Sequence, residues 1–199
     1  MPREFENTTD ITDWAQSLDD RWPERRDIMQ HISQQLQKVP FLRPNIVELC
    51  CGPGTLAEFL LRESPRIHYR GFDASQSLIN FATERLSPFE DRVTLHTADL
   101  NKDEWLKDCP DPIHAIVSMQ SLHDLGDETA VERIYHLAHT VLTRGGMFLN
   151  ADLCTPLKPG RLPVEQHLEL LEKHYYENIS CTLQKNSFVC VTGFKGPLT

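Results

Sequence analysis

The sequence predicts an α/β fold in which a mainly parallel sheet carries helices on both faces. From residue 45 onward, short β-branched runs alternate with amphipathic segments, and this strand–helix order repeats five times. A tight turn, Gly52-Pro53-Gly54, follows the first of these strands. Two further runs close the chain and predict an antiparallel hairpin at one edge of the sheet.

The expected strands are short runs bounded by turn-forming residues, and they span 45–50, 67–72, 92–98, 113–119 and 147–153. The hairpin strands span 177–184 and 187–194 and are joined through Lys185-Asn186.

The expected helices of this region span 55–63, 75–86, 128–142 and 164–176, with a weaker segment at 103–108. Ser75 is a suitable N-cap for the helix 75–86. Arg144-Gly145-Gly146 is expected to end the helix 128–142. Residues 10–38 read as one or two helices, closed by Pro40 and Pro44, because apolar residues recur there at helical spacing.

The length, hydrophobic content and net charge of the chain favour a globular protein with no nucleic-acid or membrane partner. The chain has 199 residues, which fits one domain with an extension, and 40% of them are hydrophobic, enough for a core. The net charge is −9 and no Lys/Arg stripe is present, so nucleic acid is disfavoured as a partner. We expect no membrane partner and a cytoplasmic location, because the N-terminus is polar and no apolar run reaches the roughly 18–20 residues of a membrane span.

The six cysteines match the spacing of neither a zinc site nor a disulfide framework. We expect small buried thiols in a reducing compartment, and no metal. No motif specifies an oligomeric state.

The glycine turn points to a nucleoside ligand. Gly52-x-Gly54-x-x-Ala57 satisfies the dinucleotide pattern, and Asp73 ends the second strand about twenty residues on. Glycine allows the backbone to approach a ligand, and a carboxylate accepts hydrogen bonds from two ribose hydroxyls. The pattern alone fits both NAD and S-adenosylmethionine.

Three features favour S-adenosylmethionine. Glu48, four residues before Gly52, would repel a pyrophosphate but suits an ammonium and a sulfonium. Pro53 removes an N–H donor that a phosphate would use. Asp99 follows the third strand, where an acid can read an adenine amino group.

These segments resemble the motifs of class I S-adenosylmethionine-dependent methyltransferases. VELCCGPGT resembles their motif I, GFDAS their motif II, TADL the adenine-reading motif, and LTRGGMFLNAD the segment leading into the fifth strand. The resemblance runs from about 45 to 194. Cys50 stands where the family has its first glycine, and we interpret this as tolerated because the position requires a small residue.

The resemblance implies a Rossmann-like doubly wound seven-stranded sheet of order 3-2-1-4-5-7-6, with strand 7 antiparallel. It divides the single structural domain into an N-terminal helical cap, 1–44, and an S-adenosylmethionine-binding methyltransferase part, 45–199. S-adenosylhomocysteine would be the product. The implied cofactor-binding residues are Glu48, Cys50, Gly52, Gly54, Asp73, Ala74, Ser75, Asp99, Leu100, Met119 and Gln120.

Within that set, Glu48 and the Gly52 and Gly54 backbone would hold the methionine part, Asp73 the ribose, and Asp99 with Leu100 the adenine. Methyl transfer from a sulfonium needs a base only when the acceptor atom carries a proton. The candidate base is His123, in the stretch 118–128 after the fourth strand, with Asp124 to orient it. We expect transfer to an O or N atom of a small-molecule acceptor.

The acceptor pocket would draw on the N-terminal helices, with Trp14, Trp22, Arg25, Arg26 and His31 as candidates, and on the proline-rich loop 155–163. Arg25 and Arg26 could attract an acceptor carboxylate. The plainer alternative is that the tryptophans pack the helices and the arginines face water.

Two other functions compete. An NAD(P)-dependent oxidoreductase would need a hydride-handling pair such as Tyr-x-x-x-Lys, and neither Tyr135 nor Tyr175-Tyr176 has a lysine four residues on. The Cys50 departure also leaves open a binding protein that keeps the cofactor pocket without turnover.

Overall fold

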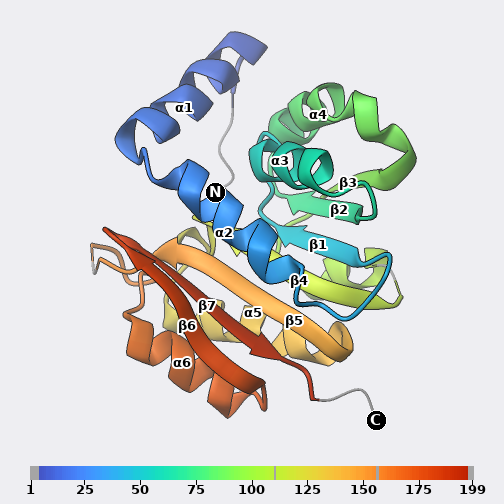
Figure 1. Cartoon of the computed structure of the whole chain (residues 1–199). Helices are drawn as coiled ribbons and strands as arrows, with labels where there is room; N and C mark the ends of the chain where they lie inside the picture. The colour runs from blue at the N-terminus through green and yellow to red at the C-terminus, as the bar shows by residue number, and fades with distance from the viewer. Residues whose placement is uncertain (1–4, 110, 156, 197–199) are drawn as a thin grey trace.

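A single seven-stranded sheet forms the centre of the molecule (Figure 1). The computed structural model describes residues 5–109, 111–155 and 157–196. The strand order is β3-β2-β1-β4-β5-β7-β6, and β7 runs antiparallel between β5 and β6. The topology that the family resemblance implied is therefore confirmed.

The strands are β1 (Asn45–Leu49), β2 (His68–Asp73), β3 (Val93–Thr97), β4 (Ile113–Met119), β5 (Leu142–Leu153), β6 (Glu177–Lys185) and β7 (Phe188–Phe194). The α-helices are α1 (Thr8–Arg21), α2 (Arg25–Leu36), α3 (Thr55–Glu63), α4 (Gln76–Arg85), α5 (Glu128–Val141) and α6 (Val164–Lys173). Three 3₁₀ helices complete the described elements: η1 (Ser87–Arg92), η2 (Asp103–Asp108) and η3 (Leu122–Asp124).

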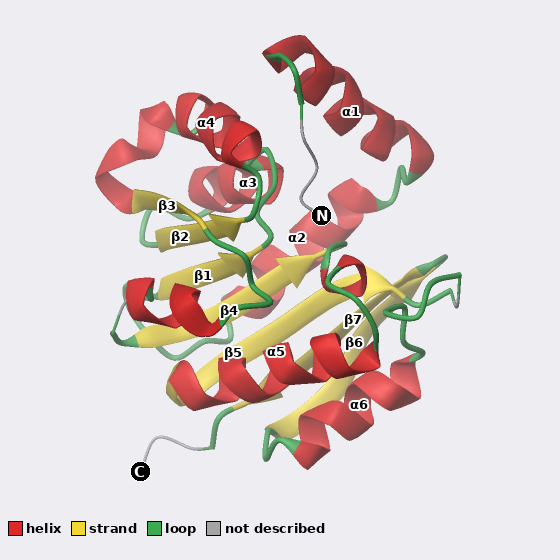
Figure 2. Ribbon diagram, turned by 180° about the vertical axis from the view of Figure 1, so that it is seen from behind, coloured by secondary structure: helices red, strands yellow, loops and turns green. Residues whose placement is uncertain are grey.

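Helices cover the two faces of the sheet in separate groups. Helices α2, α3 and α4 pack on one face, and α5 and α6 on the other (Figures 1 and 2). The central strand β4 is buried along its whole length, whereas the edge strand β6 keeps exposed positions, as expected for a strand with one neighbour. Each face therefore has its own apolar core.

The N-terminal helices belong to the first of these cores. Helix α2 buries Ile28, Ile32 and Leu36 against the side chains of α3 and the sheet. Their spacing of four residues places them on one stripe of the helix. Helix α1 contributes only Ile11 to the buried residues and contacts α4. No helix within the described ranges is long and apolar enough to cross a membrane.

The expected ends of two helices and the expected start of one strand are wrong. Helix α5 ends at Val141, and β5 begins at Leu142, so the glycine pair lies inside the strand. Gly145 has φ 75° and donates its N–H to the carbonyls of Lys195 and Gly196. Gly145 therefore forms hydrogen bonds to the C-terminal segment and does not cap the helix. Helix α6 ends at Lys173, because Tyr175 takes φ 63°.

The hairpin connection is one residue later than expected. Strand β6 continues through Lys185, and Asn186 and Ser187 form the connection. Asn186 takes φ 51°, a conformation that asparagine tolerates better than most residues.

Truncation of the buried stripe of α2 tests whether the N-terminal helices contribute to the common core. We expect Ile32→Ala to lower the free energy of unfolding by about 2–4 kcal/mol, because Ile32 is fully buried. The measurement is urea denaturation followed by circular dichroism. Gln30→Ala, on the exposed side of the same helix, is the matched control and should change little. Equal effects of the two substitutions would contradict this packing.

Candidate active site

The carboxyl ends of β1 and β2 are tied together by Asp73. The backbone N–H of Gly52 donates to Asp73 Oδ2 at 2.8 Å, and that of Ser75 donates to Oδ1 at 2.9 Å. Burial raises the pKa of Asp73 above its ordinary value, although both amides oppose the rise. Because Asp73 is only partly buried, this fixed carboxylate can still accept hydrogen bonds from hydroxyl groups of a ligand.

The two glycines of the turn have different structural roles. Gly52 has φ 54°, and a Cβ added to it would meet no atom within 4 Å, so the space in front of this backbone is open. Gly54 has φ 76°, and a Cβ there would lie 3.2 Å from that of Ala82 and 3.3 Å from Leu86 Cδ1. Gly52 thus leaves room for a ligand, whereas Gly54 lets α3 begin against α4.

Cys50 shows that the first motif position requires more than a small side chain. It adopts φ 57°, a left-handed conformation that favours glycine. The sequence interpretation, that small size suffices, therefore missed the conformational requirement. Burial raises the pKa of the Cys50 thiol well above its ordinary value, so this cysteine stays protonated and is not a reactive thiolate.

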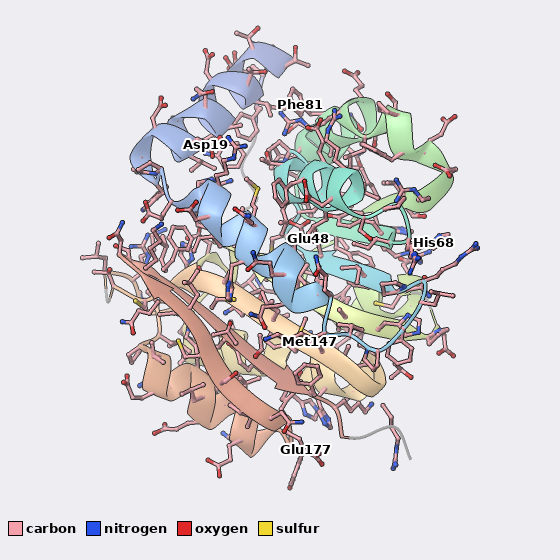
Figure 3. The ribbon with its side chains drawn as sticks, in the orientation of Figure 1. Asp19, Glu48, His68, Phe81, Met147 and Glu177 are labelled. Carbon is pink, nitrogen blue, oxygen red and sulfur yellow. The ribbon has the colours of Figure 1, made fainter. Side chains whose placement is uncertain are left out.

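Glu48 is a buried acid beneath the turn. Its side chain is 3% exposed, and the Tyr69 hydroxyl donates to Oε2 at 2.6 Å. Burial raises the pKa of Glu48 to about 8, and the Tyr69 hydrogen bond opposes this rise. Figure 3 shows Glu48 in β1 behind α2. A cationic ligand group at the edge would stabilise its charged form.

The remaining cofactor candidates divide into exposed and structural positions. Asp99 is exposed and accepts a hydrogen bond from Asn101 N at 3.0 Å, while Leu100 is buried. Ala74 is exposed. Ser75 is buried and caps α4, because its Oγ accepts from Leu78 N at 3.3 Å.

His123 is paired with an acid that the sequence analysis did not single out. Its Nδ1 lies 2.5 Å from Asp152 Oδ1, and its backbone N–H donates to Asp152 Oδ2 at 3.0 Å. Both side chains are buried. Asp152 lies near the carboxyl end of the buried strand β5, and a buried acid in an apolar strand is the same signal that identified Glu48.

Asp124 does not take the orienting role expected for it. Its Oδ1 lies 3.5 Å from His123 Nε2 but accepts a hydrogen bond from Lys158 Nζ at 2.6 Å. Partial burial would raise the pKa of Asp124, but Lys158 and His123 outweigh this effect and lower it. Asp152 therefore fixes the imidazole ring, and Asp124 contributes negative charge near Nε2.

The loop that follows β5 packs directly on the His123 segment. A Cβ added at Gly160 would lie 2.5 Å from the His123 carbonyl oxygen and 2.8 Å from that of Gly126. Only glycine permits this approach, so the loop passes directly against the backbone of the His123 segment at Gly160. Pro156, which belongs to the expected loop 155–163, lies outside the described residues.

Met119 is the last residue of β4 at the same edge, and Gln120 directly follows it. Met119 is buried in the core of the first face, and Gln120 takes φ 59° while its N–H donates to Ala151 O at 2.7 Å. The side-chain oxygen of Gln120 accepts a hydrogen bond from Arg25 Nη1, which brings the N-terminal helices to the site.

The other N-terminal candidates have structural contacts. Trp14 stacks obliquely with Phe5, and Trp22 packs against the core beside α2. Arg26 is exposed. His31 Nε2 lies 2.9 Å from Thr182 Oγ1 and so joins α2 to β6. Of the five acceptor-pocket candidates, the structure directly links Arg25 to the edge that carries Glu48.

Comparison with known proteins identifies the family. A family described as a methyltransferase domain matches residues 46–146, about half of the chain. The chain therefore belongs to the methyltransferase domain family. Its sheet order, 3-2-1-4-5-7-6, is the order that the resemblance to class I S-adenosylmethionine-dependent methyltransferases implied. No curated protein matches it.

Solved structures of low sequence identity share the fold. Human N-acetylserotonin methyltransferase, in complex with S-adenosylmethionine, has a TM-score of 0.64 at 17% identity, over 87% of this chain and 56% of its own. An O-methyltransferase family 2 protein from Planctomyces limnophilus, in complex with apigenin, has a TM-score of 0.65 at 18% identity. The match covers 85% of this chain and 61% of that protein. The DszA carbon methyltransferase has a TM-score of 0.68 at 14% identity, and the match covers 87% of this chain and 55% of that protein. The chain spans little more than half the length of these proteins.

The conformation of Cys50 can be tested by a matched pair of substitutions. Cys50→Ala and Cys50→Gly both remove the thiol, but only glycine removes the cost of a Cβ at positive φ. We expect the Cys50→Gly variant to be more stable than the Cys50→Ala variant by about 1 kcal/mol. Thermal and urea unfolding would measure this difference. The reverse order would mean that residue 50 does not adopt the left-handed conformation.

Proposed function

We propose that the chain transfers the methyl group of S-adenosylmethionine to an O or N atom of a small-molecule acceptor. The observation that carries the proposal is that one sheet edge holds both the Asp73–Gly52 contact and the His123–Asp152 pair. The first suits a nucleoside, and the second suits removal of a proton.

The residues at this edge fit the cofactor. Asp73 would accept the ribose hydroxyls beside the open backbone of Gly52, and Glu48 would face the ammonium group. Asp99 and Leu100 would contact the adenine, and the segment from Met119 to Gln120 would line the site. When bound, S-adenosylmethionine supplies an electrophilic methyl group on a positively charged sulfur.

His123 would receive the proton of the acceptor at Nε2. A carboxylate can only accept at Nδ1, so Asp152 keeps the proton on that nitrogen and leaves the Nε2 lone pair available. The imidazolium that forms would be stabilised by Asp152 and by Asp124, which lies 3.5 Å from Nε2. A base of this kind is useful for a hydroxyl or amine acceptor, which supports O- or N-methylation.

A small acceptor is supported by the short connections around the site and by the acidic composition of the chain. One protein of the same fold is named as an N-acetylserotonin methyltransferase, and another is in complex with apigenin; both compounds are small molecules. The six free cysteines support a reducing, cytoplasmic location.

The first test of this proposal is calorimetric titration with S-adenosylhomocysteine, with NADH as the control. We expect binding of S-adenosylhomocysteine alone. Binding of NADH alone would support an oxidoreductase instead. A panel of phenols, amines and carboxylates, assayed for methylated product, would then separate an enzyme from a binding protein without turnover.

Substitutions of the His123–Asp152 pair test the base. With any acceptor that this panel identifies, we expect His123→Asn to lower kcat about 10²- to 10⁴-fold while affinity for S-adenosylhomocysteine stays close to that of the wild type. Asp152→Asn should also lower kcat and change its pH profile, whereas Asp124→Asn should have a smaller effect. Full activity of the His123→Asn variant would contradict a base at this position.

The raised pKa of Glu48 predicts proton release on cofactor binding. Below about pH 8 the buried carboxyl is mostly protonated, and the ammonium group of a bound ligand favours the charged form. Affinity for S-adenosylhomocysteine should therefore rise with pH up to about 8. Calorimetry in buffers of different ionisation enthalpy would detect the released proton.

Two variants provide the controls for this effect. Glu48→Gln should abolish both the proton release and the rise in affinity. Tyr69→Phe removes the hydrogen bond that lowers the pKa of Glu48, and it should move the rise to higher pH. Proton release that persists in the Glu48→Gln variant would assign it to another group.

A further inference from the structure

Arg25 is a buried cation at the start of α2. Its side chain is 8% exposed and lies between α1 and the segment after β4. Nε donates to Asp19 Oδ1 of α1 at 2.7 Å, and Nη1 donates to the side-chain oxygen of Gln120. The neighbouring Arg26 is exposed, so burial singles out only one arginine of the pair.

The contacts of Arg25 leave part of its charge and several of its donors available. The Asp19 side chain is 48% exposed, so water screens its charge, and Gln120 is neutral. A guanidinium has five N–H groups, and acceptors within the described part of the chain engage Nε and Nη1. A buried cation of this kind suits a planar anion that binds through two oxygens.

The position of Arg25 places this cation at the cofactor edge. Gln120 directly follows Met119, the last residue of β4, and β4 pairs with β1 so that Val117 lies opposite Glu48. Burial dominates the pKa of Glu48, but the charge of Arg25 lowers it, so the two groups lie within electrostatic reach. Figure 3 shows Asp19 on α1 and Glu48 behind α2.

We propose that Arg25 binds the carboxylate at the methionine end of the cofactor while Glu48 binds the ammonium group beside it. This inference rests on the proposed function and extends it to a residue of the N-terminal helices. An α-amino acid carries both charges on one carbon, and the edge offers the buried Arg25 guanidinium together with the buried Glu48 carboxyl. The sequence analysis expected Arg25 to attract a carboxylate of the methyl acceptor. Such a carboxylate would not require Glu48 beside Arg25.

The assignment also gives the N-terminal helices a function. Arg25 connects Asp19 of α1 to Gln120 of the sheet domain, so the same side chain holds the two helices at the site and recognises the ligand. Helices α1 and α2 would thus complete the cofactor site.

Two ligands that differ only in the amino-acid end provide the test. S-adenosylhomocysteine carries that end, and 5′-methylthioadenosine lacks it but keeps the adenine, the ribose and the thioether. In calorimetry of the full chain, we expect Arg25→Gln to weaken binding of S-adenosylhomocysteine about 10- to 100-fold and to leave binding of 5′-methylthioadenosine unchanged. Unchanged binding of the second ligand shows that the variant is folded. Arg26→Gln is the matched control and should bind both ligands as the wild type does.

The other outcomes overturn the inference in distinguishable ways. If Arg25→Gln binds S-adenosylhomocysteine as the wild type does, the cofactor carboxylate is held elsewhere. If it weakens both ligands equally, Arg25 only supports the fold of the site. If the wild type binds neither ligand, the proposed function itself fails.

Discussion

The Asp73 carboxylate is the contact on which the arrangement of the site depends. It accepts hydrogen bonds from a backbone N–H of the turn after β1 and from one at the start of α4. One side chain thus sets the relative positions of two strand ends and a helix. The backbone N–H of Ala98 in turn donates to the Asp73 carbonyl at 2.8 Å, which brings the end of β3 to the same edge. Because these are backbone contacts, the left-handed conformations of Cys50 and Gly52 are required to present the turn.

Around this contact the molecule keeps ionisable groups in places where the burial of charge is costly. Glu48 and Asp152 lie in strands whose other residues are mainly apolar, and each is compensated by one side chain, Tyr69 or His123. Such acids would weaken a core that served stability alone. Both lie at the carboxyl edge, where α/β sheets bind ligands. Arg25 adds the opposite charge from outside the sheet.

The sequence analysis predicted most elements because their periodicity is local. Helix α3 and strand β4 were predicted to the residue, since apolar spacing and flanking turn residues define both. Two of the errors concern contacts between residues that lie far apart in the sequence. Gly145 resembles a helix C-cap in sequence, but its N–H bonds to the C-terminal segment. Asp124 adjoins His123 in sequence, but the hydrogen-bonding partner of the imidazole comes from β5.

The sequence is enough to predict the succession of strands and helices and the positions of Glu48, Gly52 and Asp73 near strand ends, because these depend on residue spacing within one strand–turn–helix unit. Which groups meet across the sheet depends on how the whole chain folds. His123 and Asp152 lie 29 residues apart, and Arg25 and Gln120 lie 95 apart. Such contacts follow from strand order and from the packing of α2 on the sheet. No local pattern encodes these distances, so the partners of His123 and Arg25 became visible only in the folded chain.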